Sequence, residues 1–153
     1  MRKYSLDTSG LIDAYTRYYP PDTFKGLWVK LSESAFFGYS YATKMVRTEL
    51  EKEDDDLLKW CDAQDAFFKE VDEAIQRKVA DILTTHPMLV KAGSGRSGAD
   101  PFVIALAELT DATVITGEIF GSASKPKIPD VCRDRGVKCG NVLHMIKSEG
   151  WTF

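Results

Sequence analysis

The sequence predicts an α/β fold in which a central parallel sheet of four or five strands lies between two layers of helices. Short apolar or β-branched runs alternate with longer segments of helical periodicity along the chain. Turn residues such as Pro20, Pro21 and Gly136 separate these segments. The length of 153 residues, 44% of them hydrophobic, fits a single domain over residues 1–153.

Four short runs are expected to form strands of the sheet. Each is apolar or rich in β-branched residues and is bounded by turn or capping residues. In chain order they cover residues 3–7, 37–42, 112–117 and 137–140. Because helical segments separate them, these strands are expected to pair in parallel.

The intervening segments carry apolar residues at helical spacing and are expected to form helices. They cover residues 9–19, 22–36, 44–52, 54–68, 69–86, 100–110, 129–136 and 141–149. Polar residues that can cap a helix precede or begin several of them. The candidate N-caps are Ser9, Asp22, Thr43 and Asn141.

Residues 93–98, "GSGRSG", have the glycine spacing of a dinucleotide-binding motif. In such a site the helix begins within the glycines, so Pro101 would fall in its second turn. Proline at that position would destabilise the helix by about 3 kcal/mol. A helix that begins at Asp100 suits both residues, because Asp can cap and proline is favoured at the first helical position. The glycines are therefore expected to form a loop beside an active site. A nucleotide-binding enzyme that uses these glycines stays an alternative.

Composition and charge narrow the classes of function. The net charge of −3 does not indicate a protein that binds nucleic acid through bulk positive charge. No apolar run reaches membrane-spanning length and the first residues do not resemble a signal peptide, so we expect a cytoplasmic protein without a membrane partner. The three cysteines are expected to be reduced thiols.

Four acids occupy positions that a parallel sheet brings to one edge. Asp7 ends the first strand, Glu118 follows the strand over 112–117, and Asp100 begins the helix before that strand. Glu49 borders the buried face of its own helix. Alone, each could be a cap or a surface acid, but together they would repel one another unless a divalent cation such as Mg²⁺ or Mn²⁺ neutralised them. The sequence therefore predicts a metal site.

Around these acids the sequence resembles the PIN domain family, the metal-dependent ribonucleases that include the VapC-type toxins. The matching segments are "SLDTSGLID", "TKMVRTEL", "GADPFVIALA", "ATVITGE" and the tail "KIPDVCRDRGVKCGN". The resemblance covers nearly the whole chain and is closest to an uncharacterised PIN-like subfamily. One departure is Glu118, where the family usually has Asp or Asn.

The resemblance implies a three-layer α/β/α domain that cleaves single-stranded RNA by metal-dependent endonucleolytic hydrolysis. Ser9 and Thr116 would be hydroxyls that orient the site or its substrate. The catalytic residues and ligands of Mg²⁺ or Mn²⁺ would be Asp7, Glu49, Asp100 and Glu118. The protein would be the toxin of a toxin–antitoxin pair, with a small antitoxin as its partner, and a homodimer stays open.

Three basic residues, Lys44, Arg47 and Arg96, are expected to lie near the acids and to neutralise the RNA backbone. Two further classes stay open beside the nuclease. One is a catalytically inactive PIN-like module that binds RNA or protein. The other is a protein that accepts a phosphoryl group on Asp7, which is disfavoured because Ser9 stands where a phosphatase has its second acid.

Overall fold

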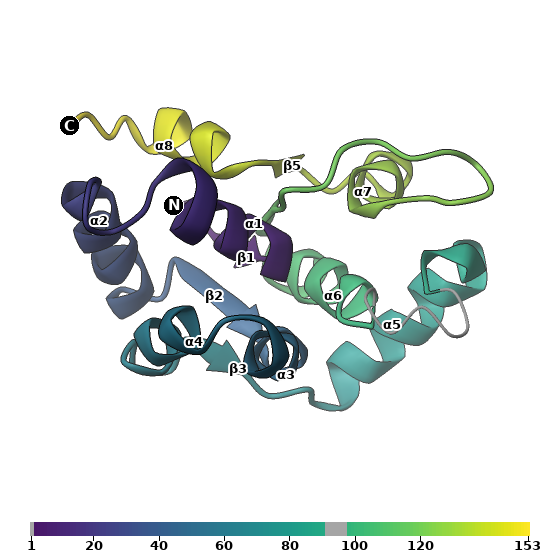
Figure 1. Ribbon diagram of the computed structural model, residues 1–153. Helices are drawn as coiled ribbons and strands as arrows, with labels where there is room; N and C mark the ends of the chain where they lie inside the picture. Colours follow the sequence, from purple (N-terminus) through teal and green to yellow (C-terminus); the bar gives the residue numbers. More distant parts are fainter. Residues whose placement is uncertain (1, 91–97) are drawn as a thin grey trace.

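The computed structural model describes residues 2–90 and 98–153, so most of the predicted glycine loop, including Arg96, lies outside the described residues. The described chain has a three-layer α/β/α architecture around a parallel sheet (Figure 1). Its strands are β1 (Tyr4–Leu6), β2 (Ser40–Thr43), β3 (Phe68–Lys69), β4 (Thr113–Ile115) and β5 (Cys139–Gly140). Their order in space is β3-β2-β1-β4-β5, and every pair is parallel. The predicted α/β class and parallel sheet are confirmed.

Helices cover the sheet and connect its strands. They are α1 (Thr8–Ile12), the π-helical turn η1 (Asp13–Tyr18), α2 (Lys25–Phe36), α3 (Lys44–Glu53), α4 (Asp55–Asp62), α5 (Glu73–Thr85), the 3₁₀ turn η2 (Pro87–Leu89), α6 (Asp100–Thr110), α7 (Ile128–Arg135) and α8 (Val142–Glu149). Helix α6 packs on β1, β2 and β4, and α5 packs on α6 (Figure 1). None of these described helices has the length and apolar content needed to cross a membrane.

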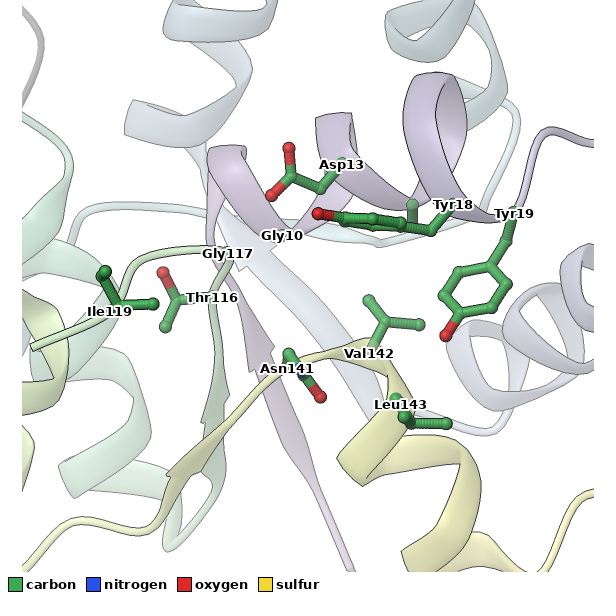
Figure 2. Close-up of a pocket in the computed structure, with 11 residues that line it drawn as sticks. Gly10, Asp13, Tyr18, Tyr19, Thr116, Gly117, Ile119, Asn141, Val142 and Leu143 are labelled. Carbon is green, nitrogen blue, oxygen red and sulfur yellow. The ribbon is translucent and has the colours of Figure 1, made fainter.

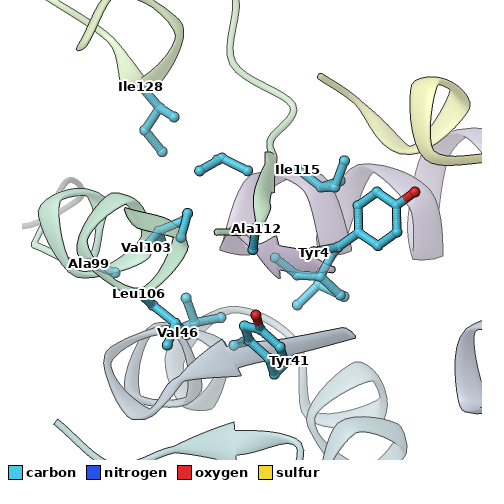
Figure 3. Close-up of a cluster of buried hydrophobic side chains, with 14 of the residues drawn as sticks. Tyr4, Tyr41, Val46, Ala99, Val103, Leu106, Ala112, Ile115 and Ile128 are labelled. Carbon is cyan, nitrogen blue, oxygen red and sulfur yellow. The ribbon is translucent and has the colours of Figure 1, made fainter. Parts of the chain in front are cut away.

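The buried core joins α6 to the sheet and to α3. Val103, Ile115, Ile128 and Val46 are inaccessible to solvent, and Figure 3 shows them together with Leu106 in one cluster. Burying a side chain of this size contributes about 1.5–3 kcal/mol. The core therefore fixes the ends of β1 and β4 relative to α3 and α6, the elements that carry the four predicted acids.

Of the four candidate N-caps Ser9, Asp22, Thr43 and Asn141, two are confirmed and two are wrong. The Val46 backbone amide donates to Thr43 Oγ1 at 3.4 Å. The His144 amide donates to Asn141 Oδ1 at 2.9 Å. By contrast, Ser9 lies inside α1, whose N-cap is Asp7. Asp22 precedes α2 by three residues, because that helix begins at Lys25.

One predicted helix is too long. The expected helix over 54–68 ends at Asp62, and Phe68 and Lys69 form the edge strand β3 beside Ala42 and Thr43. A strand of two residues has no room for the alternation of apolar and polar residues by which a strand is recognised in a sequence.

Candidate active site

The four acids expected from the sequence line one cavity of about 310 Å³, which we name the acidic cavity. Asp7 follows β1, Glu118 follows β4, Glu49 belongs to α3 and Asp100 is the first residue of α6. The strand order reverses between β1 and β4, and ligands of open α/β sheets bind at such a point, beyond the carboxyl ends of the strands. The fold thus brings the four side chains to one space, and their role as metal ligands stays a prediction.

Asp7 is held by the two hydroxyls expected to surround it. The residue is 2% exposed, and its Oδ2 accepts hydrogen bonds from Ser9 Oγ at 2.6 Å and from Thr116 Oγ1 at 2.9 Å. Ser9 Oγ accepts from the Gly117 amide, and Thr116 Oγ1 accepts from the Glu118 amide. Burial raises the pKa of Asp7, whereas the bonds from the two hydroxyls lower it. This network fixes the carboxylate between the ends of β1 and β4.

Glu49 points into the cavity because its neighbours on α3 are buried. Val46 and Leu50, three residues before it and one after it, are inaccessible to solvent and fix that face of the helix. Thr8 Oγ1 donates to Glu49 Oε1 at 2.5 Å. Burial raises the pKa of Glu49, whereas the bond from Thr8 and the nearby Ala99 amide lower it.

The second carboxylate oxygen of Glu49 is an unsatisfied acceptor. Oε2 is buried and has no hydrogen-bond partner among the residues that the structure describes. A buried acceptor left in this way costs about 1–3 kcal/mol, and a bound ion is one physical explanation for such a group.

Asp100 begins α6 but does not cap it. The N-cap position belongs to Ala99, and no side chain makes a capping hydrogen bond there, so the prediction of a cap at Asp100 is wrong. Pro101 follows in the first turn, where its missing N–H has no partner to lose. Asp100, a residue that is 6% exposed, lines the acidic cavity.

Asp100 and Glu118 are strongly affected by the other acids. Burial and then the charges of the three other acids raise the pKa of Asp100 to about 10. Burial and the charge of Asp7 raise the pKa of Glu118. The charge of Lys127 lowers both pKa values. Buried like charges of this kind are relieved either by protonation or by a cation.

The described basic residues predicted to contact RNA do not line the acidic cavity. Lys44 forms an ion pair with Glu70, and Arg47 pairs with Asp62 at 2.8 Å. Arg96 lies outside the described residues. The role of these side chains in RNA binding stays a prediction, and two of them already have acidic partners.

Two other cations lie closer to the acids. Lys52 lines the acidic cavity, and Lys127 acts on the pKa of Asp100 and Glu118. Neither was expected there from the sequence. Lys52 stands three residues after Glu49, a spacing that places both on one side of a helix, so this spacing could have identified it. Lys127 belongs to a long loop and carries no comparable signal.

The residues of the cavity fit a hard divalent cation in their chemistry. They offer carboxylate oxygens, the preferred ligands of Mg²⁺ and Mn²⁺, and one of these oxygens is buried without a partner among the described residues. They do not form a closed cage: across residues 2–90 and 98–153, no three acidic, histidine or cysteine side chains are placed to bind one ion together. Binding would need side-chain rotation or bridging waters, which Mg²⁺ readily retains.

Comparison of the sequence with curated proteins gives no match. The sequence profile of a family described as "Domain of unknown function (DUF4411)" matches residues 4–153. The matched segment includes the four predicted acids, the fifth acid of the cavity, Glu53, and every strand of the described sheet. On this match over nearly its whole length, the chain belongs to the family of unknown function DUF4411.

Proposed function

We propose that this protein is a PIN-like, metal-dependent endoribonuclease that hydrolyses the phosphodiester bonds of single-stranded RNA. One observation carries the proposal. Four carboxylates from four separate elements line one cavity at the carboxyl edge of a parallel sheet, and one of their oxygens is buried without a partner among the described residues. The resemblance of the surrounding segments to PIN ribonucleases supplies the substrate class.

Each acid has a role in this proposal. Asp7, Asp100 and Glu118 would hold Mg²⁺ or Mn²⁺, and Glu49 would hold a second ion or orient the attacking water. Such an ion lowers the pKa of bound water and stabilises negative charge on the phosphate. Ser9 and Thr116 hold the Asp7 carboxylate in one orientation.

The charge of the cavity sets a condition on RNA binding. The acids that line it would repel a phosphodiester, and burial together with the charges of neighbouring acids raises the pKa values of Glu49, Asp100 and Glu118. Lys52 and Lys127 offset only part of this negative charge. A bound cation is therefore required to bring the substrate close as well as to promote hydrolysis.

The proposal extends to the biological partner. In PIN-type toxins a small antitoxin protein blocks the site, and we propose the same pairing here for a cytoplasmic toxin. The antitoxin would have to cover the acidic cavity to prevent cleavage. A homodimer is compatible with this arrangement.

A second candidate is a PIN-like module that binds RNA or protein without catalysis. The arrangement of the acids favours it, because no three metal-binding side chains of the described residues are placed around one point. It predicts RNA binding that is independent of divalent metal and yields no fragments.

Incubation of the purified protein with a mixed pool of single-stranded RNA, in Mn²⁺ or in EDTA, separates the two candidates. The nuclease should give fragments only with metal, and Asp7→Asn and Asp100→Asn should give none. Asp111→Asn is the matched control, because Asp111 is an exposed acid at the end of α6 and should be dispensable. RNA binding without fragments in Mn²⁺ and in Mg²⁺ would overturn the nuclease proposal.

A further inference from the structure

A second cavity, of about 330 Å³, lies beside the acidic cavity, and we name it the tyrosine pocket. Its walls include Asp13, Tyr18, Tyr19 and Asn141 (Figure 2). Thr116 also lines it, and the hydroxyl of Thr116 donates to an Asp7 oxygen of the acidic cavity. The volume lies at the lower end of the range for small-molecule sites, and one residue connects the two spaces.

An unusual backbone turn presents the two tyrosines. In η1 the Tyr19 amide donates to Ala14 O at 2.8 Å, five residues earlier. Such π-helical turns are rare in proteins, but where they occur they often lie at functional sites. Tyr18 is 59% exposed although it is a large aromatic residue. Figure 2 shows Tyr18 and Tyr19 on one side of the pocket, with Asn141 and Leu143 across from them. The pocket thus exposes an aromatic face that could stack on a planar group.

Close backbone packing places the Asp13 carboxylate on the pocket wall. A Cβ atom on Gly10 would lie 2.9 Å from Ile115 O, so glycine allows α1 to approach the end of β4. A Cβ atom on Gly117 would collide with Asp13 Oδ2, so this carboxylate lies directly against the Gly117 backbone. At Gly10 the obstacle is backbone, whereas at Gly117 it is the Asp13 carboxylate itself.

The polar groups of the pocket have capacity for a ligand. Asp13 has an ionic partner in Arg17 at 3.7 Å, but the Arg17 side chain is 70% exposed, and exposed pairs of this kind are weak. Asn141 uses Oδ1 to cap α8. Within the described part of the chain, its Nδ2 donors have no hydrogen-bond partner. The pocket therefore combines a carboxylate acceptor, amide donors and an aromatic ring.

We propose that the tyrosine pocket binds the base of a nucleotide that flanks the scissile phosphate, with a preference for guanine. This inference rests on the proposed function, since it names the part of the RNA that lies next to the cleaved bond. Tyr18 would stack on the base, as aromatic residues do in proteins that bind single-stranded RNA.

The donors and acceptors of the pocket favour guanine over the other bases. Guanine presents two adjacent N–H donors, at N1 and N2, that one carboxylate accepts, and Asp13 is that carboxylate. Its O6 accepts from the Asn141 amide. Uracil places its single N–H between two carbonyl oxygens, which a carboxylate repels. Adenine and cytosine place an acceptor nitrogen beside their amino group.

Titration of the protein with the four ribonucleosides in EDTA, followed by NMR chemical shifts, tests the pocket without metal, phosphate or catalysis. Guanosine should bind more tightly than adenosine, cytidine and uridine. Tyr18→Ala should weaken guanosine binding at least about fivefold, and Tyr18→Phe, which keeps the ring, should restore it. Asp13→Asn should remove most of the preference for guanosine over adenosine.

Two variants serve as matched controls. Phe36→Ala removes an exposed aromatic ring from α2, and Asp111→Asn neutralises an exposed acid at the end of α6. Both should bind guanosine like the wild type. Equal binding of all four nucleosides, no saturable binding of any, or unchanged binding in Tyr18→Ala and Asp13→Asn would overturn the inference.

The outcome stays separable from that of the nuclease proposal. Metal-dependent cleavage by a wild type that shows no preference for guanosine would refute the pocket and leave the nuclease standing. Selective guanosine binding that depends on Tyr18 and Asp13, without cleavage of any RNA in Mn²⁺, would support the pocket and refute hydrolysis.

Discussion

Thr8 Oγ1 donates a hydrogen bond of 2.5 Å to Glu49 Oε1, and this interaction joins α1 to α3 at the acidic cavity. Thr8 is buried, and the second oxygen of Glu49 has no partner among the described residues. Thr8 is thus the residue that fixes the orientation of Glu49.

The change Thr8→Val keeps the shape of the side chain and removes its donor. It removes the Thr8 hydrogen bond from the part-buried Oε1 of Glu49, so the free energy of unfolding in EDTA should fall by about 1–3 kcal/mol. Urea denaturation measures this loss. Thr48→Val is the control, because the Thr48 hydroxyl bonds only to the exposed Lys44 carbonyl and its loss should cost within about 0.5 kcal/mol. Equal losses in the two variants would show that Thr8 does not support Glu49.

Asp100→Asn should stabilise the metal-free protein at neutral pH. Burial and the neighbouring acids raise the pKa of Asp100 to about 10 in the folded state, so its contribution to stability is full below the unfolded pKa and is lost as pH rises toward the folded value. At pH 7 asparagine avoids this loss, and the gain in unfolding free energy should be at least about 1 kcal/mol.

The unfolding free energies of Asp100→Asn and the wild type, measured by urea denaturation at pH 7, are measured again at about pH 4 as an internal control. There the aspartate is protonated in the folded state and about half protonated in the unfolded state, so the difference between Asp100→Asn and the wild type should shrink to a fraction of its value at pH 7. Asp111→Asn should give no gain at either pH, because Asp111 is exposed. A difference for Asp100→Asn that does not change with pH would contradict the account of the buried charge.

Gly117→Ala should damage the tyrosine pocket. The added Cβ atom would collide with Asp13 Oδ2, so either the carboxylate or the loop after β4 must move, at a cost of about 1–3 kcal/mol. Gly98→Ala is the matched control, because a Cβ atom there meets nothing within 4 Å. Thermal unfolding and guanosine titration should both distinguish the two variants. A Gly117→Ala protein that equals the wild type in both would place Asp13 elsewhere.

RNA binding should depend more on Lys52 and Lys127 than on Lys44 and Arg47. The first two act at the acidic cavity, whereas the other two are engaged with acidic partners outside it. Each of Lys52→Ala and Lys127→Ala should weaken binding uniformly across sequences and reduce the salt slope by about 0.7 for each phosphate that is no longer neutralised. Filter binding at several salt concentrations measures this, and a larger effect of Lys44→Ala or Arg47→Ala would reverse the assignment.

The positions of the site residues could be predicted from the sequence, because the boundaries of helices and strands determine where their side chains lie. The apolar spacing of Val46 and Leu50 predicts which face of α3 is buried, and the structure confirms that both are inaccessible to solvent. That face determines where Glu49 points. Asp7 and Glu118 follow from strand ends, because parallel strands place their carboxyl ends at one edge of the sheet.

The features that the sequence did not predict depend on tertiary contacts. Lys127 is placed by a loop whose course is fixed when Asp130 Oδ2 accepts from the amides of Gly121 and Lys127 at 2.7 and 2.8 Å. Tyr18 reaches its pocket through the π-helical turn η1, which sequence periodicity does not distinguish from an α-helix. No periodic pattern records either relationship.

The most direct test of the central claim, that the acidic cavity binds a divalent cation, is the melting temperature of three proteins in Mn²⁺ and in EDTA. The proteins are the wild type, Asp100→Asn and the control Asp111→Asn. At 100 times the dissociation constant, Mn²⁺ should stabilise the wild type and Asp111→Asn by about 2.7 kcal/mol, and Asp100→Asn should lose most of this gain. A wild type whose melting temperature does not respond to Mn²⁺, or an Asp100→Asn protein with the full response, would contradict the claim.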